Sequence, residues 1–179
     1  MRKKTPLLFF AITCVFVLTS IAQESKRYEK YGVEFEYRTD WLLNEKAAKE
    51  ADEIALSSSE ADAQITVVAV RKKLDGEDLA AEARKRVIEP WIAELTKMYS
   101  LQGVTFERAD TKVQAAGGVA DAVQLKFDYG GERGQVDAYW SIFDRRMVLV
   151  YMIRPDRKAE KAAACWDLIR RTIKAQAKK

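Results

Sequence analysis

The sequence predicts an α+β fold: an α/β/α sandwich on a mostly antiparallel sheet, with one long mid-chain helix and one C-terminal helix. Residues 75–100 and 156–173 repeat apolar side chains every three or four positions, which indicates two amphipathic helices. Residues 63–73 and 147–153 carry apolar side chains at odd and even positions, which indicates strands covered on both faces. A sheet with two apolar faces needs a layer on each face, and the two helices are the layers that this chain offers.

The first half of the chain favours short strands separated by turns. Residues 31–37 alternate valine and aromatic side chains with glutamates, which is typical of a half-buried strand. Short apolar segments at 41–43 and 54–56 predict the next two strands, with residues 47–52 between them as a loop or a single helical turn.

The long helix is predicted to begin at Asp75 as N-cap and to end before Gly103. Pro90 lies within it and should kink or split it, because proline lacks the N–H that the helix needs. Its apolar stripe consists of Leu79, Ala83, Val87, Trp91, Leu95 and Met98.

The second half predicts a meander of antiparallel strands followed by the closing helix. The glycine pairs at 117–118 and 130–131 and the pair Asp144-Arg145 fall between alternating segments, where hairpin turns are expected. The strand candidates are residues 104–113, 119–129, 135–143 and 147–153.

The N-terminus has the pattern of an export signal. Three basic residues precede an uncharged, apolar segment at 6–22, and Ser20 and Ala22 place small residues at −3 and −1 of a cut between Ala22 and Gln23. The export signal therefore predicts a periplasmic or extracellular protein. Two alternatives stay open: residues 6–22 as an uncleaved membrane anchor, and Cys14 as a lipid-attachment site.

Domain boundaries follow from this signal and from the strand and helix patterns. We expect a signal peptide at 1–22, a flexible polar lead-in at 23–30, a single globular domain at 31–175 and a basic tail at 176–179. Removal of residues 1–22 takes away three of the 31 basic residues and no acidic residue, so 28 basic and 27 acidic residues remain. A net charge of +1 with no basic stripe speaks against nucleic-acid binding.

Several kinds of site lack the residues that they need. The chain has no histidine, which excludes Ser-His-Asp and Cys-His nucleophiles, and Cys165 is the single cysteine after residue 22. The acidic residues around Asp75 do not have the spacing of a calcium loop, and the glycine clusters do not open a helix as a phosphate loop does. We therefore predict no catalytic residue, metal ligand or cofactor. Tyr139, Ser141 and Phe143 share one strand face, and they could border a pocket or partner surface or be buried beneath a helix.

Residues 31–41, YGVEFEYRTDW, resemble the opening strand and turn of the PsbP-like superfamily. The order of strands and helices after this segment resembles that superfamily as far as residue 173. The resemblance implies an α/β/α sandwich and a binding or assembly module rather than an enzyme, since the superfamily contains photosystem II subunits, a Ran-binding import factor and bacterial envelope proteins.

Three functional hypotheses are compatible with the sequence. The first is an exported, non-catalytic envelope protein that binds a protein partner or supports an assembly. The second is a periplasmic protein that binds a small ligand or a lipid. The third is a hydrolase with an unrecognised carboxylate or Ser-Lys site, which the missing histidine and motifs disfavour.

Overall fold

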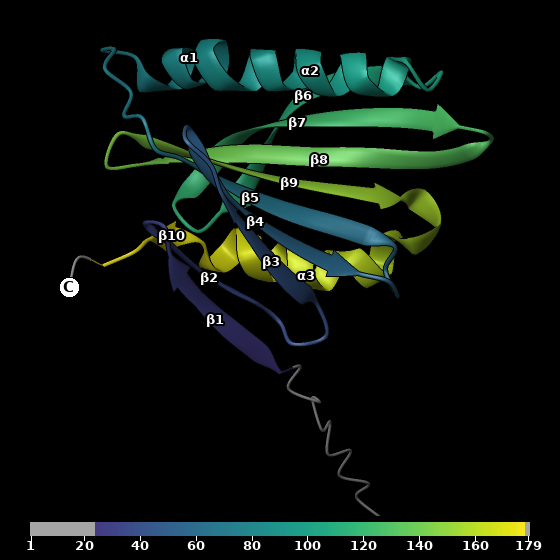
Figure 1. Cartoon of the computed structure of the whole chain (residues 1–179), viewed down its shortest axis with the longest axis horizontal. Coiled ribbons are helices and arrows are strands. Elements are labelled where there is room, and N and C mark those ends of the chain that lie inside the picture. Colours follow the sequence, from purple (N-terminus) through teal and green to yellow (C-terminus); the bar gives the residue numbers. More distant parts are fainter. Residues whose placement is uncertain (1–23, 178–179) are drawn as a thin grey trace, which may run out of the picture.

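The computed structural model describes residues 24–177, which form a strongly curved seven-stranded sheet with a layer on each face (Figure 1). The strand order is β3-β4-β5-β9-β8-β7-β6, and every neighbouring pair is antiparallel. The strands are β3 (Leu42–Ala47), β4 (Ala51–Ser58), β5 (Ala63–Val70), β6 (Thr105–Ala115), β7 (Gly118–Tyr129), β8 (Glu132–Phe143) and β9 (Arg146–Pro155). The predicted mixture of two helices and a mostly antiparallel sheet is confirmed.

A second sheet of three strands covers part of one face, in the order β1-β2-β10, with β1 (Ser25–Lys30), β2 (Val33–Arg38) and β10 (Lys174–Ala175). The prediction of a flexible lead-in at 23–30 was wrong for residues 25–30, which pair along the full length of β2. One side chain explains why residues 25–30 form a strand: Tyr28 is buried and stacks on Phe35 with ring centroids 4.9 Å apart. The other residues of β1 are polar and mostly exposed because β1 is an edge strand.

The first strands of the large sheet are longer than the sequence suggests. Strand β3 extends to Ala47 and β4 begins at Ala51, so the predicted loop is confined to residues 48–50, and the prediction was wrong for residues 47, 51 and 52. Polar side chains on the exposed face of β3 hide the apolar alternation that would have predicted it.

The mid-chain helix runs continuously from Leu79 to Ser100 as α1 (Leu79–Ala83), a π-helical turn η1 (Arg84–Ile88) and α2 (Glu89–Ser100). Its N-cap is Asp78, not Asp75, because the Asp78 carboxylate accepts a hydrogen bond from the Ala81 N–H at 3.0 Å. The helix is not split at Pro90, since it continues from Leu79 to Ser100 through this residue. The wider π turn, in which the Glu89 N–H donates to the Arg84 carbonyl, ends just before the position where proline has no N–H to donate.

An ion-pair cluster fastens this helix to β6. Glu89 accepts two hydrogen bonds from Arg108, both at 2.8 Å, and Arg84 bridges Glu89 at 3.1 Å and Asp110 at 2.7 Å. The two arginines lower the pKa of Glu89 to about 2, with the Arg108 hydrogen bonds as the largest cause. These side chains are partly exposed to solvent, so the cluster connects the helix to β6 through solvated ion pairs rather than through buried apolar contacts.

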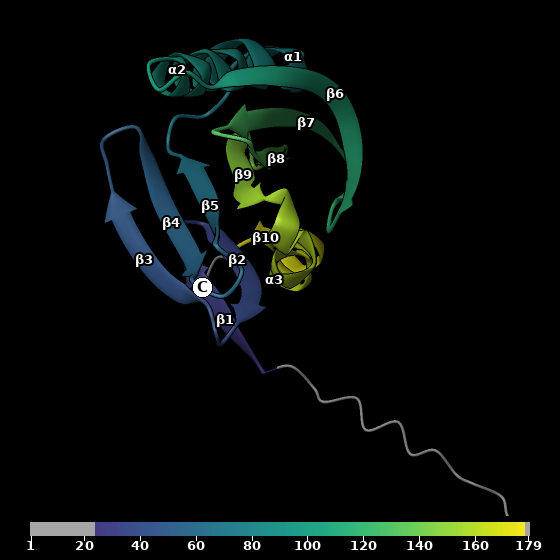
Figure 2. The ribbon, with the colours of Figure 1, turned by 90° about the vertical axis from the view of Figure 1, so that its right-hand side faces the viewer.

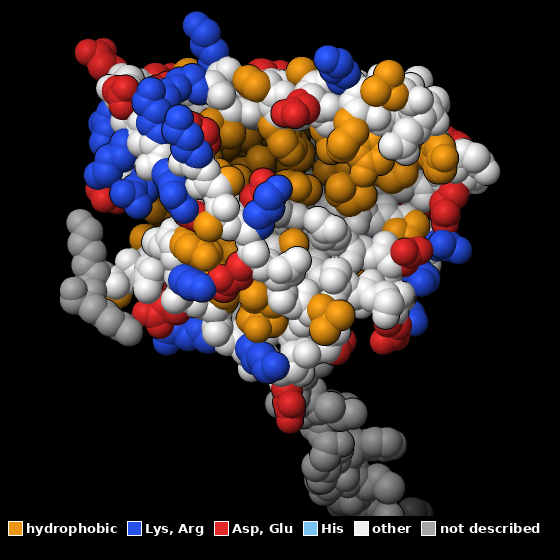
Figure 3. Space-filling view, viewed as in Figure 1, with side chains coloured by type: hydrophobic (Ala, Val, Ile, Leu, Met, Phe, Trp, Pro, Cys, Tyr) orange, Lys and Arg blue, Asp and Glu red, His pale blue; other side chains and the backbone are white. Residues whose placement is uncertain are grey.

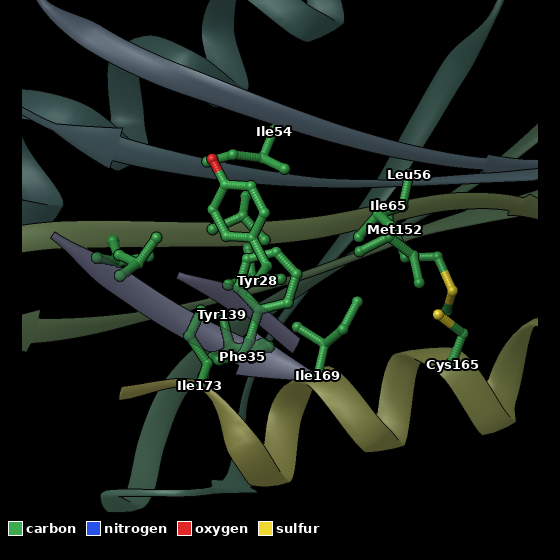
Figure 4. Packing of buried hydrophobic residues seen from close by; sticks show 14 of the residues in the cluster. Tyr28, Phe35, Ile54, Leu56, Ile65, Tyr139, Met152, Cys165, Ile169 and Ile173 are labelled. Atoms are coloured by element: carbon green, nitrogen blue, oxygen red, sulfur yellow. The ribbon is translucent and has the colours of Figure 1, made fainter. Parts of the chain in front are cut away.

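The inner face of the large sheet packs on α3 (Ala159–Thr172), which follows a short 3-10 turn η2 (Asp156–Lys158), and on the small sheet (Figure 2). Figure 4 shows residues of this core projecting toward one another from β2, α3 and the large sheet. Cys165 lies on the inner side of α3 and is buried, and this burial raises the pKa of its thiol to about 11.

The outer face packs on the mid-chain helix through a separate apolar cluster. Ile88, Ile92 and Leu95 lie over side chains of β7, β8 and β9. At the end of the helix, Tyr99 meets Phe106 edge-on with ring centroids 5.8 Å apart. The helix therefore lies over the β6–β9 half of the sheet (Figure 2).

The predicted boundaries at the two ends of the chain, a signal at 1–22 and a basic tail at 176–179, are only partly covered by the described residues. The expected signal, with Cys14 and the cut between Ala22 and Gln23, lies outside the described residues, as do residues 178–179. Gln176, expected in the basic tail, donates its backbone N–H to the Gly32 carbonyl at 3.0 Å and so extends the β2–β10 pairing. Within residues 24–177, no helix is long and apolar enough to cross a membrane.

Candidate functional site: the open half of the sheet

The outer face of the large sheet is only half covered. Along each strand alternate side chains point to this face, and the cross-strand register places Val68 beside Leu149 and Thr66 beside Tyr151. The mid-chain helix packs over β7, β8 and β9, with Val68 and Val70 of β5 at the border of that contact, while β4 and β3 lie beyond it. The outer surface of β4 and β3 is thus uncovered, whereas that of β5 is partly covered and its Thr66 is buried.

An apolar shelf lies where the helix stops covering the sheet. We define the shelf by Val68 and Val70 of β5, Tyr151 and Ile153 of β9 and Trp91 of α2, all of them partly exposed. The rings of Trp91 and Tyr151 lie 5.1 Å apart, so the helix and the sheet meet at this pair. Figure 3 shows the same region as a hollowed, apolar area below the mid-chain helix.

Small and polar side chains continue the shelf toward the edge of the sheet. Ala55 of β4 lies beside Thr66, and Glu53 lies beside Val68. Strand β3 forms the edge, and its Leu42 is 77% exposed. The shelf therefore has an apolar centre and a more polar border, which is the composition of many protein-binding surfaces.

Basic residues gather at one end of the shelf, where the β3–β4 hairpin, the segment after β5 and the β8–β9 turn meet (Figure 3). Two of them are paired: Arg71 with Asp52 at 2.5 Å and Lys73 with Asp144 at 3.2 Å. Arg145 donates to the carbonyls of Leu74 and Gly76, which ties the turn to the loop before α1. Within residues 24–177 the members of this basic end that lack an ion pair or side-chain hydrogen bond are Lys46, Lys49, Lys72 and Arg146.

The three side chains singled out from the sequence lie away from the shelf. Tyr139 is on the inner face, has no exposed surface and packs against Trp166 of α3 at a ring distance of 5.4 Å. Burial raises the pKa of its hydroxyl. Tyr139 is therefore under α3 and borders no surface, whereas Ser141 and Phe143 are partly exposed and line a shallow hollow near the β6–β7 turn.

The sequence pattern did not reveal the shelf. The apolar alternation of β5 and β9 predicts burial on both faces, and the helical spacing of Trp91 predicts a member of the buried stripe. The width of the predicted sheet could have indicated an uncovered area, because a single helix is too narrow to cover one face of a sheet with this many strands.

Within residues 24–177, no group of three cysteine, aspartate or glutamate side chains could hold a metal ion. The shelf itself offers apolar contact through its aromatic and branched side chains, with charge contributed by the basic end.

No protein-family model matches the sequence, and no curated protein matches it. Among solved structures, the chain is similar to the cyanobacterial PsbP (CyanoP) of Synechocystis sp. PCC 6803, with a TM-score of 0.64, 12% identity and coverage of 86% of this chain and 93% of that one. It is also similar to a protein from Bacteroides thetaiotaomicron, with a TM-score of 0.54, 12% identity and coverage of 86% of this chain and 49% of that one. A mutant of the protein Mog1 has a TM-score of 0.48 and 10% identity, with coverage of 86% of this chain and 96% of that one.

Proposed function

We propose that this chain, which has the PsbP-like fold, is an exported, non-catalytic accessory protein that binds a protein partner through the apolar shelf. The fold expected from residues 31–41 is the fold that it shares with CyanoP. The single observation that supports the binding role is the half-covered outer face, where Trp91 and Tyr151 stay partly exposed.

The shelf has the features of a docking surface. Contiguous exposed apolar area is unfavourable in water unless another molecule covers it. Tryptophan and tyrosine are the residues that most often dominate binding energy in protein interfaces, and Trp91 and Tyr151 lie together at the centre of the shelf.

The charges beside the shelf define the partner's chemistry. Lys46, Lys49 and Lys72 lie at one end without ion-pair partners among the described residues. A partner with an apolar patch bordered by carboxylates at that end would complement both features. Such complementarity speeds association and selects the partner. The proposed export rests on the sequence of residues 1–22.

The test is a cross-linking pull-down of the tagged full chain from intact envelopes with two matched variants. Val68→Lys places a charge in the centre of the shelf, opposite Glu53 on β4, which can pair with it and preserve the fold. Val119→Lys makes the same change on β7 at a residue that is 69% exposed and lies outside the shelf.

We expect one protein to be recovered near stoichiometrically with the wild type and with Val119→Lys, and to be lost with Val68→Lys. The purified partner should then bind Val68→Lys at least about tenfold more weakly, which is about 1.4 kcal/mol. Recovery of the same partner by Val68→Lys, or of no stoichiometric partner by the wild type, would contradict the proposal.

A further inference from the structure

A cavity of about 420 Å³ opens between the two sheets, at the end of the molecule where β2, β9 and β10 meet. Its volume lies in the range of small-molecule sites, about 300–1,000 Å³. Its floor is formed by buried apolar side chains of the inner core, among them Val33, Ala69 and Val148. The cavity shares Val70 with the apolar shelf and Arg146 with its basic end. The centre of the shelf lies outside the cavity, since Val68, Trp91 and Tyr151 do not line it.

The mouth of the cavity carries hydrogen-bond donors. Arg146 lines the cavity and is exposed, and its side chain makes no ion pair or hydrogen bond with any residue of 24–177. A Cβ atom on Gly32 would lie 3.9 Å from Nη1 of Arg146, so the guanidinium group lies beside the β1–β2 turn. Gln176 accepts a hydrogen bond from the Gly32 N–H through Oε1 at 3.2 Å, which leaves its Nε2 as a second donor at the mouth.

Among residues 24–177, the one carboxylate that lines the cavity is already engaged. Asp144 binds Lys73 with an Oδ2–Nζ distance of 3.2 Å, so its charge is opposed by a lysine outside the cavity. An exposed guanidinium group and an amide above an apolar floor therefore define the chemistry that a ligand would meet.

We propose that this cavity binds an amphiphilic carboxylate, with its apolar part on Val33 and Val148 and its carboxylate on Arg146. Arginine matches a carboxylate through two parallel N–H donors. A purely polar anion would leave the apolar floor uncovered, and a neutral apolar molecule would leave Arg146 without a partner.

The test is calorimetric titration of the full chain with laurate below its micelle-forming concentration, with dodecanol and acetate as partial mimics. Arg146→Gln removes the proposed charge contact, and Arg133→Gln makes the same change at an exposed arginine that lines a different hollow. Ala175→Trp adds bulk at an exposed position on the cavity lining without altering the buried floor.

We expect laurate to bind at one site per chain, about tenfold more weakly to Arg146→Gln and with unchanged affinity to Arg133→Gln. Ala175→Trp should abolish binding, and dodecanol and acetate should bind weakly or not at all. Circular dichroism would confirm that each variant keeps the fold.

The proposal would be overturned by no saturable binding of laurate, by equal affinity of the two arginine variants, or by equal binding of dodecanol. Weaker laurate binding by Val68→Lys would also overturn it, because that result would place the ligand on the apolar shelf. The two proposals can fail separately. If the wild type recovers no stoichiometric partner but binds laurate as expected, the proposed function fails and this inference stands.

Discussion

Each helix of this protein sets a tryptophan against a tyrosine of the large sheet, yet the two pairs lie in different surroundings. On the inner face, Trp166 meets Tyr139 at 5.4 Å and 75°, and on the outer face Trp91 meets Tyr151 at 5.1 Å and 42°. Tyr139 has no exposed surface, whereas Tyr151 is partly exposed. Similar contacts are thus used for a closed core on one face and for an open shelf on the other.

The difference comes from the width of the covering layer. A helix is about 10 Å wide and neighbouring strands lie about 4.8 Å apart, so one helix covers two or three strands. The inner face adds the small sheet to α3, and the outer face has the mid-chain helix alone. The part of the outer face that remains uncovered is where we place partner binding.

The largest expected effect is on stability. Tyr139→Ala should lower the free energy of unfolding by about 3–5 kcal/mol, because it leaves a cavity in a closed core. Tyr151→Ala should lower it by about 1–2 kcal/mol, because its side chain is already partly solvated. Urea unfolding of both variants measures the difference, and equal losses would show that the two faces are equally closed.

Thiol labelling should separate the two faces by rate. Cys165 is buried and its pKa is raised to about 11, so the native protein should react very slowly at pH 8. Ala55→Cys, in a Cys165→Ala background, places a thiol on the partly exposed outer face of β4. It should react on the order of 100-fold faster. Comparable native rates would mean that the outer face is covered or that α3 opens readily.

The smallest expected effect concerns the polar attachment of the mid-chain helix. The folded-state pKa of Glu89, about 2, lies below its ordinary value of 4.5. Its stabilisation is therefore present above about pH 4.5 and is lost as the pH falls toward 2. Because the Glu89 side chain is 42% exposed, we expect less than about 1 kcal/mol.

Urea unfolding at pH 6 and pH 3 measures this contribution. Glu89→Gln should reduce the loss of stability between the two pH values. Glu94→Gln, an exposed position on the same helix without an ion pair among the described residues, should leave that loss unchanged. The same response in both variants would exclude the ion-pair cluster as its source.

Local sequence patterns predicted most of the fold but little of the site. The turns at 130–131 and 144–145 were predicted correctly and the one expected at 117–118 lies at 116–117, because glycine and a tight polar pair favour turns irrespective of the rest of the chain. Strand β1 was missed because one buried tyrosine in a polar segment gives no alternation. The N-cap was misplaced because several acidic residues precede the helix, and local sequence does not distinguish among them.

The sequence by itself determined the helices, most of the strands and the sandwich, because these follow from periodicities within each segment. Only the tertiary structure decided which apolar faces are covered, since coverage depends on where distant segments pack. Val68 and Val67 are equivalent as sequence, yet Val67 is buried in the inner core and Val68 is partly exposed on the shelf. The meeting of Arg146 with Gly32 and Gln176 around one cavity likewise joins three distant parts of the chain.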